Sequence, residues 1–208
     1  MESEFKNIYD NNKWGHGSGD GSRLKSVKDY MSFLERFLQD NNIKSVVDAG
    51  CGDWQFSKDI NWNDIDYKGF DIVDSVIENN LENFSDKNIS FEVYNGNPDD
   101  LPCADLLIVK DVLQHLPYED TLEFINNFSK YKYCLITNCI NPHGETININ
   151  INREDFTFLD LRLEPFKINA KEVFSFKNHI PLYKLLLLKK AKWIKKTLLV
   201  DNSNGKYI

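Results

Sequence analysis

The stretch Val46-Val47-Asp48-Ala49-Gly50-Cys51-Gly52-Asp53-Trp54 decides the fold of this chain. A short run of strand-forming apolar residues ends in an acid, and two closely spaced glycines follow it. Glycines at this point remove side-chain bulk, so that backbone N–H groups can lie flat against a bound molecule. The pattern therefore predicts a buried strand followed by a ligand-binding turn that leads into a helix.

A second acid, Asp71, supports this interpretation. It closes the apolar-flanked segment Tyr67-Lys68-Gly69-Phe70-Asp71-Ile72, about twenty residues after the glycine turn. In a parallel strand–helix–strand unit, an acid at the end of the second strand is placed to accept hydrogen bonds from both ribose hydroxyls of a nucleoside. The two acids and the glycine turn together predict a pocket for an adenosine-containing cofactor.

Composition sets the broad class. The chain has 208 residues, 41% of them hydrophobic and 13% aromatic, which suits one domain with a full core. The net charge is −7, and the only dense basic stretch lies near the C-terminus, so nucleic acid is not an expected partner. The four cysteines show no metal-binding spacing, and buried reduced thiols are expected. With no apolar signal-peptide core near the start, these features predict a cytoplasmic protein.

The segment near the C-terminus carries one long apolar run. Leu185-Leu186-Leu187-Leu188 is too short to cross a bilayer, so a buried strand is expected and no membrane span. The lysines that follow it, including Lys195 and Lys196 beside Trp193, are expected to form a solvated basic tail or to touch an anionic surface.

Hydrophobic periodicity gives the order of elements. Helical spacing over 27–38 precedes an alternation of strands and helices, and that alternation is typical of a parallel sheet covered on both faces. The expected strands are 44–48, 67–71, 89–94, 104–110, 133–139, 157–163 and 182–188; the other expected helices are 55–60, 74–84 and 119–131. We therefore expect an α/β fold: a Rossmann-like, seven-stranded, mostly parallel sheet with helices on both faces. Residues 1–26 are expected to form an N-terminal lid segment, and 27–208 a single domain.

With these elements in place, the chain resembles the class I S-adenosylmethionine (SAM)-dependent methyltransferases. Asp48, Gly50 and Gly52 match their acid-x-Gly-x-Gly turn, and Asp71 matches the acid that closes the second strand. A later acid–x3–His element is formed by Asp111 and His115. The resemblance implies SAM as cofactor and S-adenosylhomocysteine (SAH) as product.

A narrower likeness is to a group of methyltransferases associated with glycan modification. The residues that carry it are 8–15 and 18–22, Cys51 within the glycine turn, and the late pair Leu159-Asp160-Leu161 and Pro165-Phe166. Two positions depart from that pattern: Asn95 replaces a usual acid near the adenine, and 156–158 replaces a Gly and an Arg. An asparagine carbonyl still accepts a hydrogen bond from the adenine amino group. The likeness implies a sugar acceptor.

These arguments assign the cofactor site. Asp48 is a candidate for the cationic amino acid end of SAM, Asp71 for the ribose, and Asn95 and its neighbours for the adenine. The opening segment is expected to act as a lid, in which serines donate to the cofactor carboxylate. The full predicted set is Trp14, Ser18, Ser22, Asp48, Gly50, Cys51, Gly52, Asp53, Trp54, Asp71, Ile72, Asn95, Gly96, Asn97 and Asp111.

The catalytic candidates follow the fourth strand. His115 is the first choice for general base, because imidazole titrates near neutral pH. Asp111 would orient His115 or contact SAM, or would itself be the base. A histidine that only caps the turn before Pro117 is the structural alternative.

Polar residues after the fifth strand, Asn138, Asn141 and His143, together with Asp160, are predicted to line a hydroxyl-rich acceptor site. No residue cluster requires a metal, although Asp111 and Asp160 could hold Mg²⁺.

The function predicted from the sequence is methylation of a sugar hydroxyl, on a nucleotide sugar or a glycan terminus. Two alternatives stay open: methylation of another small hydroxylated or amino compound, and a catalytically silent SAM-binding scaffold. A weak homo-oligomer also stays open. A nicotinamide-dependent oxidoreductase is disfavoured, because the turn lacks the third glycine of that fingerprint.

Overall fold

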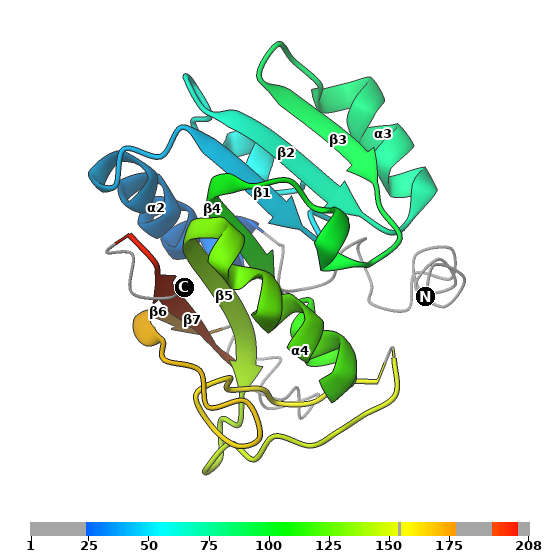
Figure 1. Ribbon diagram of the computed structural model, residues 1–208. Coiled ribbons are helices and arrows are strands. Elements are labelled where there is room, and N and C mark those ends of the chain that lie inside the picture. Colours follow the sequence, from blue (N-terminus) through cyan, green and yellow to red (C-terminus); the bar gives the residue numbers. More distant parts are fainter. Residues whose placement is uncertain (1–23, 154, 178–192, 204–208) are drawn as a thin grey trace, which may run out of the picture.

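The computed structural model describes residues 24–153, 155–177 and 193–203. This part of the chain forms one sheet of seven strands and three α-helices (Figure 1). The strands are β1 (Ser45–Ala49), β2 (Asp66–Asp71), β3 (Ile89–Val93), β4 (Ala104–Lys110), β5 (Tyr131–Ile140), β6 (Lys171–Lys177) and β7 (Ile194–Asp201). The helices are α2 (Leu24–Asp40), α3 (Asp74–Phe84) and α4 (Tyr118–Asn127). Four single 3₁₀ turns complete the set: η2 (Ser57–Asp59), η3 (Pro98–Asp100), η4 (Leu113–His115) and η5 (Phe128–Lys130).

The strand order is β3-β2-β1-β4-β5-β7-β6. The first five strands in that order run parallel, whereas β7 is antiparallel to both of its neighbours. The order reverses between β1 and β4, and ligands bind at such a reversal in open α/β sheets. The expected Rossmann-like, seven-stranded, mostly parallel sheet is confirmed.

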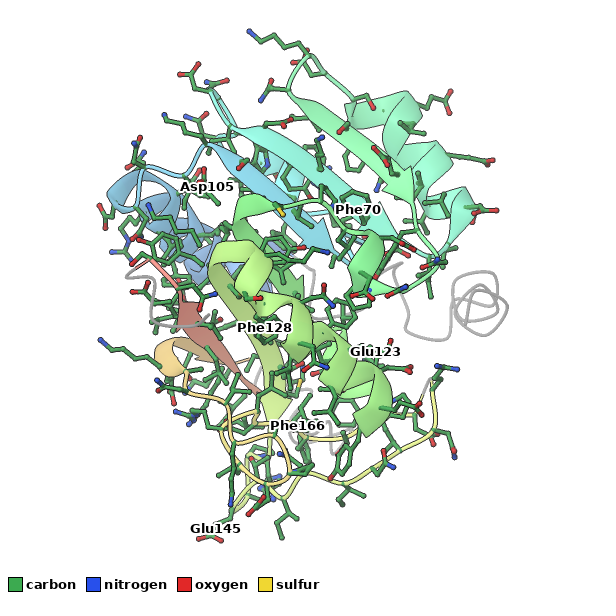
Figure 2. All side chains as sticks on the ribbon, viewed as in Figure 1. Phe70, Asp105, Glu123, Phe128, Glu145 and Phe166 are labelled. Carbon is green, nitrogen blue, oxygen red and sulfur yellow. The ribbon has the colours of Figure 1, made fainter. Side chains whose placement is uncertain are left out.

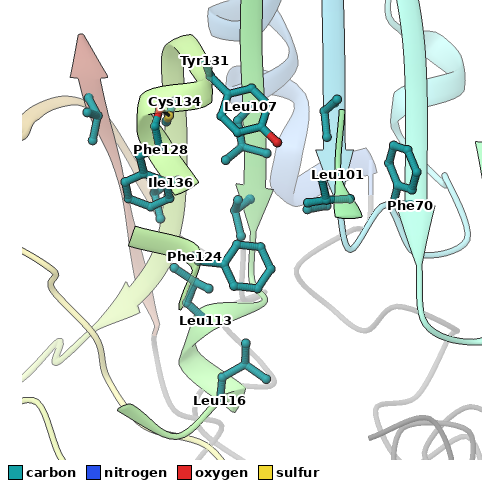
Figure 3. Close-up of a cluster of buried hydrophobic side chains, with 14 of the residues drawn as sticks. Phe70, Leu101, Leu107, Leu113, Leu116, Phe124, Phe128, Tyr131, Cys134 and Ile136 are labelled. Carbon is teal, nitrogen blue, oxygen red and sulfur yellow. Dashed lines mark hydrogen bonds between the residues drawn. The ribbon is translucent and has the colours of Figure 1, made fainter. Parts of the chain in front are cut away.

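Helices cover both faces, as expected. Along β4, Leu106 and Ile108 belong to the core that packs under α2, whereas Leu107 and Val109 belong to the core under α4. Figure 3 shows the second core, a cluster of buried residues to which both Phe124 of α4 and Leu107 of β4 belong. Alternate side chains of a strand point to opposite faces, so an almost wholly apolar strand is what a sheet buried on both sides requires.

Asp105 joins the amino ends of β1 and β4. One of its carboxylate oxygens accepts from the backbone N–H groups of Lys44 (2.8 Å) and Ser45 (3.1 Å). The backbone N–H of Asp105 donates to the Ser45 hydroxyl in return (2.9 Å). Asp105 lies at the end of the sheet opposite the segment 141–170, in which Figure 2 labels Glu145 and Phe166. These bonds fix the register of the two strands whose other ends form the site.

Several predicted elements differ from the structure. The predicted strand 157–163 is wrong: this segment is irregular, and its N–H groups bond to scattered carbonyls, as Thr157 does to Gln114 and Leu159 to Cys139. Its alternating apolar residues imitate a strand because Leu159 and Leu161 are buried against the α4 side of the core. The strand next along the chain is β6 instead.

The remaining differences concern ends and lengths. The predicted helix 55–60 is a turn followed by η2, and the predicted helix 119–131 ends as α4 at Asn127, before η5. Helix α2 begins at Leu24, inside the segment expected to be a lid. The predicted strand 182–188 and residues 1–23 of the predicted lid lie outside the described residues.

The central position of β5 predicts a large cost for truncating its core side chains. Leu135→Ala removes a fully buried side chain, which should lower the free energy of unfolding by about 2–5 kcal/mol. Leu122→Ala is the matched control on α4, because Leu122 is 44% exposed, and it should change stability by less than about 0.5 kcal/mol. Urea unfolding measures both. Equal effects of the two substitutions would contradict this packing.

Candidate functional site

A cavity opens at the carboxyl ends of β1, β2 and β4, where the strand order reverses. Its empty volume, with the solvent at its open mouth included, is about 990 Å³. The loops after β1 to β4 and the buried face of α2 line it. The lining residues are Tyr30, Leu34, Asp48, Gly50, Cys51, Gly52, Phe56, Ser57, Asp71, Ile72, Tyr94, Gly96, Ile108, Lys110, Asp111, Val112, His115, Leu116 and Phe124.

The glycine turn after β1 has a backbone that few residues other than glycine adopt. Gly50 has φ +82° and Gly52 has φ +56°. A Cβ on Gly50 would also lie 2.3 Å from Cγ2 of Val112, another cavity residue. The N–H groups of Gly50 and Cys51 both donate to the Phe70 carbonyl (2.7 and 3.0 Å), which ties the turn to β2. Glycine is therefore needed here by both backbone strain and close packing.

Asp71 ends β2 with its carboxylate directed at the turn. One oxygen accepts from the Gly52 N–H (3.0 Å) and the other from the Val73 N–H (3.1 Å). Burial raises the pKa of Asp71 to about 6, although these N–H donors favour its charged form. Each oxygen has further acceptor capacity beyond its backbone bond.

Asp48 is the corresponding acid at the end of β1. The Tyr67 hydroxyl donates to it at 2.7 Å, deep below the turn. Burial raises the pKa of Asp48 to about 6, and the Tyr67 hydrogen bond and the charge of Lys110 oppose this shift. Two carboxyl groups at adjacent strand ends thus hold protons more tightly than free aspartates do.

Asp111 has a different environment, because two lysines pair with it. Nζ of Lys110 and Nζ of Lys195 both donate to the same oxygen, Oδ2, at 2.7 and 2.5 Å. Burial would raise the pKa of Asp111, but the two ammonium groups prevail and lower it to about 2. Its other oxygen, Oδ1, is buried and has no hydrogen-bond partner among the described residues. Asp111 is therefore a permanent anion, with little tendency to take up a proton.

The position of Lys195 corrects the expectation of a solvated basic tail. Lys195 lies on β7 and is only 4% exposed, and Lys196 pairs with Glu172 on β6 (2.8 Å). Lys195 and Lys196 are successive residues of β7, a strand that the sequence analysis did not predict. Their side chains therefore lie on opposite faces of the sheet, where Lys195 binds Asp111 and Lys196 binds Glu172.

His115 sits in η4, and its hydrogen bonds determine which ring nitrogen carries the proton. Oε1 of Gln114 accepts from the Cys139 N–H (2.7 Å), so the Gln114 amide presents its NH₂ to Nε2 of His115 (3.3 Å). Nδ1 of His115 lies 3.0 Å from the Asp155 carbonyl, which requires a proton on Nδ1. Burial lowers the pKa of His115, against the opposing effect of that carbonyl. His115 is thus a neutral imidazole with its lone pair on Nε2.

The structure brings together most of the predicted cofactor residues and both catalytic candidates. The predicted residues that line the cavity are Asp48, Gly50, Cys51, Gly52, Asp71, Ile72, Gly96, Asp111 and His115. Both catalytic candidates line this cavity: Asp111 directly follows β4, and His115 is the last residue of η4.

Four predicted cofactor residues are not among the lining residues. Trp54 is buried in the α2-side core, where its ring packs on Tyr67, Phe84 and Phe91. Asp53 accepts a hydrogen bond from Gln55 (2.5 Å). Asn95 and Asn97 are exposed and hold the loop after β3: Asn95 accepts from the Asn97 N–H (2.7 Å), and Asn97 caps η3. Trp14, Ser18 and Ser22 lie outside the described residues.

The structure does not bring the four predicted acceptor residues to the cavity either. Asn138 is buried in β5, with no partner for its Oδ1 in the described part of the chain. Asn141 and His143 share a loop in which Oδ1 of Asn141 accepts from the His143 N–H (3.0 Å). Asp160 accepts two hydrogen bonds from the Arg162 guanidinium (2.9 and 2.7 Å) and one from the Arg162 N–H (3.1 Å). Burial would raise the pKa of Asp160, but Arg162 holds it below the usual value.

The sequence analysis missed the apolar wall of the cavity and its lysine. The missed residues are Tyr30, Leu34, Phe56, Ser57, Tyr94, Ile108, Lys110, Val112, Leu116 and Phe124. Lys110 could have been found from the sequence, because it is a charged residue directly after the apolar run 106–109. Tyr30 could not have been found in this way, because an aromatic residue at helical spacing is typical of the hydrophobic core.

Metal binding finds no support in the donor set. Across the described ranges, no group of three or more His, Cys, Asp or Glu residues could hold a metal ion. Asp111 and Asp160 already pair with lysines and an arginine, so neither carboxylate offers Mg²⁺ an uncompensated charge. All four cysteines are unpaired; Cys103 is exposed, whereas Cys134 and Cys139 are buried. Within the described helices, none is long and apolar enough to span a membrane.

Comparison with known proteins places the fold. No protein-family model matches this chain, and no curated protein matches it in sequence. Among solved structures, it is similar to a SAM-dependent methyltransferase from Anabaena variabilis, with 12% identity over 96% of this chain and 93% of that one and a TM-score of 0.62. TehB from Haemophilus influenzae matches at 18% identity over 82% of this chain, with a TM-score of 0.59. The match spans 61% of the TehB chain, less than two thirds of its length.

A third similar structure was solved with the cofactor. Magnesium protoporphyrin IX methyltransferase (ChlM) from Synechocystis with bound SAM shares 14% identity over 95% of this chain and 89% of that one, with a TM-score of 0.55. At these identities the likeness concerns the fold. The chain has the class I methyltransferase fold.

Proposed function

We propose that this chain is a SAM-dependent methyltransferase. The observation that carries the proposal is the buried Asp71 carboxylate, which faces the cavity beside the Gly50–Gly52 turn. An acid in this position is placed to bind a ribose, and the turn allows a ligand to approach the backbone closely.

The cavity residues fit an adenosyl sulfonium along its length. Ile72, Tyr94 and Gly96, at the ends of β2 and β3, supply an apolar wall for an adenine beyond the ribose acceptor Asp71. Asp48, at the end of β1, supplies an anion for the amino group of the aminoacyl end. The strand order β3-β2-β1-β4 supports this proposal, because the proposed contacts for adenine, ribose and amino acid would then follow one another along the sheet edge.

When bound, SAM would supply a methyl group on a positively charged sulfur, which is already a good leaving group. The protein has to place a nucleophile in line and remove its proton. His115 is the group suited to that proton transfer, because its ring is neutral at pH 7 and carries its lone pair on Nε2. That lone pair faces the Gln114 amide at 3.3 Å, so an acceptor hydroxyl would have to take the place of this contact. Asp111 does not take this role, because two ammonium groups lower its pKa to about 2 and so make its carboxylate a very weak base.

The finer proposal is O-methylation of a small hydroxylated acceptor, with a sugar as the leading candidate. A neutral imidazole base suits an alcohol. The sugar depends on the resemblance at Leu159-Asp160-Leu161 and Pro165-Phe166 and remains a prediction. Transfer of radiolabelled methyl from SAM to a panel of nucleotide sugars, free sugars and small amines tests it. Transfer only to amines would contradict O-methylation, and no transfer with tight SAM binding would favour a silent scaffold.

Substitution of Asp71, the proposed ribose acceptor, should weaken cofactor binding. Asp71→Asn removes one carboxylate acceptor at the cavity, and we expect the Kd for SAH to rise at least about tenfold in calorimetry. Asp66→Asn makes the same change at the exposed start of β2 and should leave the Kd within about twofold. Thermal melts establish that both variants fold. An unchanged Kd for Asp71→Asn would remove the ribose assignment.

The affinity for SAM should depend on pH. Without ligand, the raised pKa of about 6 for Asp48 and for Asp71 means that both groups take up protons as the pH falls through 6. A ligand that places an ammonium at Asp48 and hydroxyls at Asp71 favours the charged forms, so binding releases protons in this range. We expect affinity to rise between pH 5 and 7 and to flatten above. Calorimetry in buffers of different ionisation enthalpy measures the released protons, and a flat Kd from pH 5 to 8 would contradict the assignment.

Loss of the proposed base should separate turnover from binding. With an acceptor from the panel, His115→Gln should lower kcat by roughly 10²–10⁴-fold. The Kd for SAH should stay within about threefold, because His115 lies beyond the proposed adenosyl and amino acid contacts. Gln114→Glu tests the tautomer, since it replaces the donor to Nε2 by an acceptor and should shift the pH dependence of kcat to higher pH. An unchanged kcat for His115→Gln would eliminate it as the base.

A further inference from the structure

Lys110 is the one cation among the residues known to line the cavity, and the proposed function leaves it without a role. It is 9% exposed, and its ammonium lies 5.1 Å from the centre of the Phe56 ring and 5.9 Å from that of Tyr30. Aromatic faces attract a cation but do not replace the water it loses, so the ammonium needs an anion. Asp111 supplies one.

Because Asp111 is paired with two lysines, Lys110 can leave it without removing its last counterion. Lys195, which lies on β7, donates to the same Oδ2 of Asp111. If Lys110 turns toward a ligand, Asp111 remains paired with Lys195, and no buried carboxylate is left uncompensated. A buried ion cluster is weak evidence for stability, since apolar residues of the same volume often stabilise a core as well. A binding role explains the second lysine better.

The charges nearest Lys110 define the ligand. Asp48 is in register with Ile108 across the parallel pair β1–β4. Lys110 follows Ile108 by two residues, so its side chain lies on the same face of the sheet as Asp48, on the neighbouring strand. One anion and one cation therefore stand side by side at the cavity wall, and their interaction is strong enough for each to shift the other's pKa. This pair matches the ammonium and carboxylate of an α-amino acid, whereas a phosphate dianion would be repelled by Asp48.

We propose that Lys110 binds the carboxylate of the aminoacyl end of the methyl donor, with Asp48 at its amino group and Asp111–Lys195 as the counterion pair that lets Lys110 turn. This assignment rests on the proposed function, because it needs SAM in this cavity. It makes Lys110 a residue that recognises the amino acid end and the Asp111–Lys195 pair a positioning device.

The test compares SAM with decarboxylated SAM, which keeps the sulfonium and the amino group and lacks only the carboxylate. For Lys110→Met, we expect the Kd for SAM to rise about thirtyfold, while the Kd for decarboxylated SAM stays within about twofold of the wild type. Lys110→Arg keeps the charge and should retain most of the preference for SAM. Lys58→Met is the matched control on an exposed lysine of η2 and should change neither Kd.

The outcomes separate the two proposals. If the wild-type protein binds neither compound, the proposed function fails and the role of Lys110 fails with it. If it binds both, and Lys110→Met weakens both equally or neither, only the carboxylate assignment is overturned. Should Lys110→Met not fold, Lys110→Gln keeps a hydrogen-bond donor for Asp111 and gives the same comparison.

Discussion

The burial of several charges at one edge of the sheet constrains the rest of this site. Asp48, Asp71 and Asp111 end three neighbouring strands or the turn directly after one, and all lie in a cavity whose walls are largely apolar. An isolated carboxylate in such a place costs several kcal/mol, so each must be neutral, hydrogen-bonded or paired. The three aspartates meet this requirement in three ways: by a tyrosine hydroxyl, by two backbone N–H groups and by two ammonium groups.

These different partners give chemically similar residues different properties. Asp48 and Asp71 have their pKa raised by burial, so a ligand that supplies a positive charge or hydroxyl donors draws them into the ionised form. Asp111 is already ionised because Lys110 and Lys195 hold it so. The first two respond to a ligand, and the third supplies a fixed charge against which the lysines are oriented.

The sequence predicts the parts of the fold that depend on local pattern. The strand that ends at Asp48, the positive-φ glycines and the acid at Asp71 all follow from residue type and spacing, because a parallel sheet brings successive strand ends to one edge. The same reasoning places Asp111 and His115 together, since both follow β4 within one turn. These elements form the half of the cavity built by β1, β2 and β4.

The parts that could not be predicted depend on contacts between distant segments. Lys195 lies 84 residues from Asp111 in the chain, and only the pairing of β7 with β5 brings them together. Trp54 follows the glycines as a ligand residue would, yet its φ of +54° turns it into the core. Leu159 and Leu161 are both buried, as alternating residues of a strand would be. The segment is nevertheless held by single hydrogen bonds to distant backbone groups and not by the regular ladder of a sheet.

The long segment between β5 and β6 links the fold to His115, the proposed catalytic base. It extends past the carboxyl end of β5 (Figure 1), and its Asp155 carbonyl orients the His115 ring while the Thr157 N–H donates to the Gln114 carbonyl. The Gln114 side chain is fixed in turn by the Cys139 N–H of β5. The protonation state of His115 is therefore set by a strand end and by an irregular segment, neither of which belongs to the glycine turn. It follows that the part of the cavity built on β1 and β2 and the His115 side chain of η4 are positioned by separate contacts. The glycine-turn motif therefore carries no information about the contacts that orient His115.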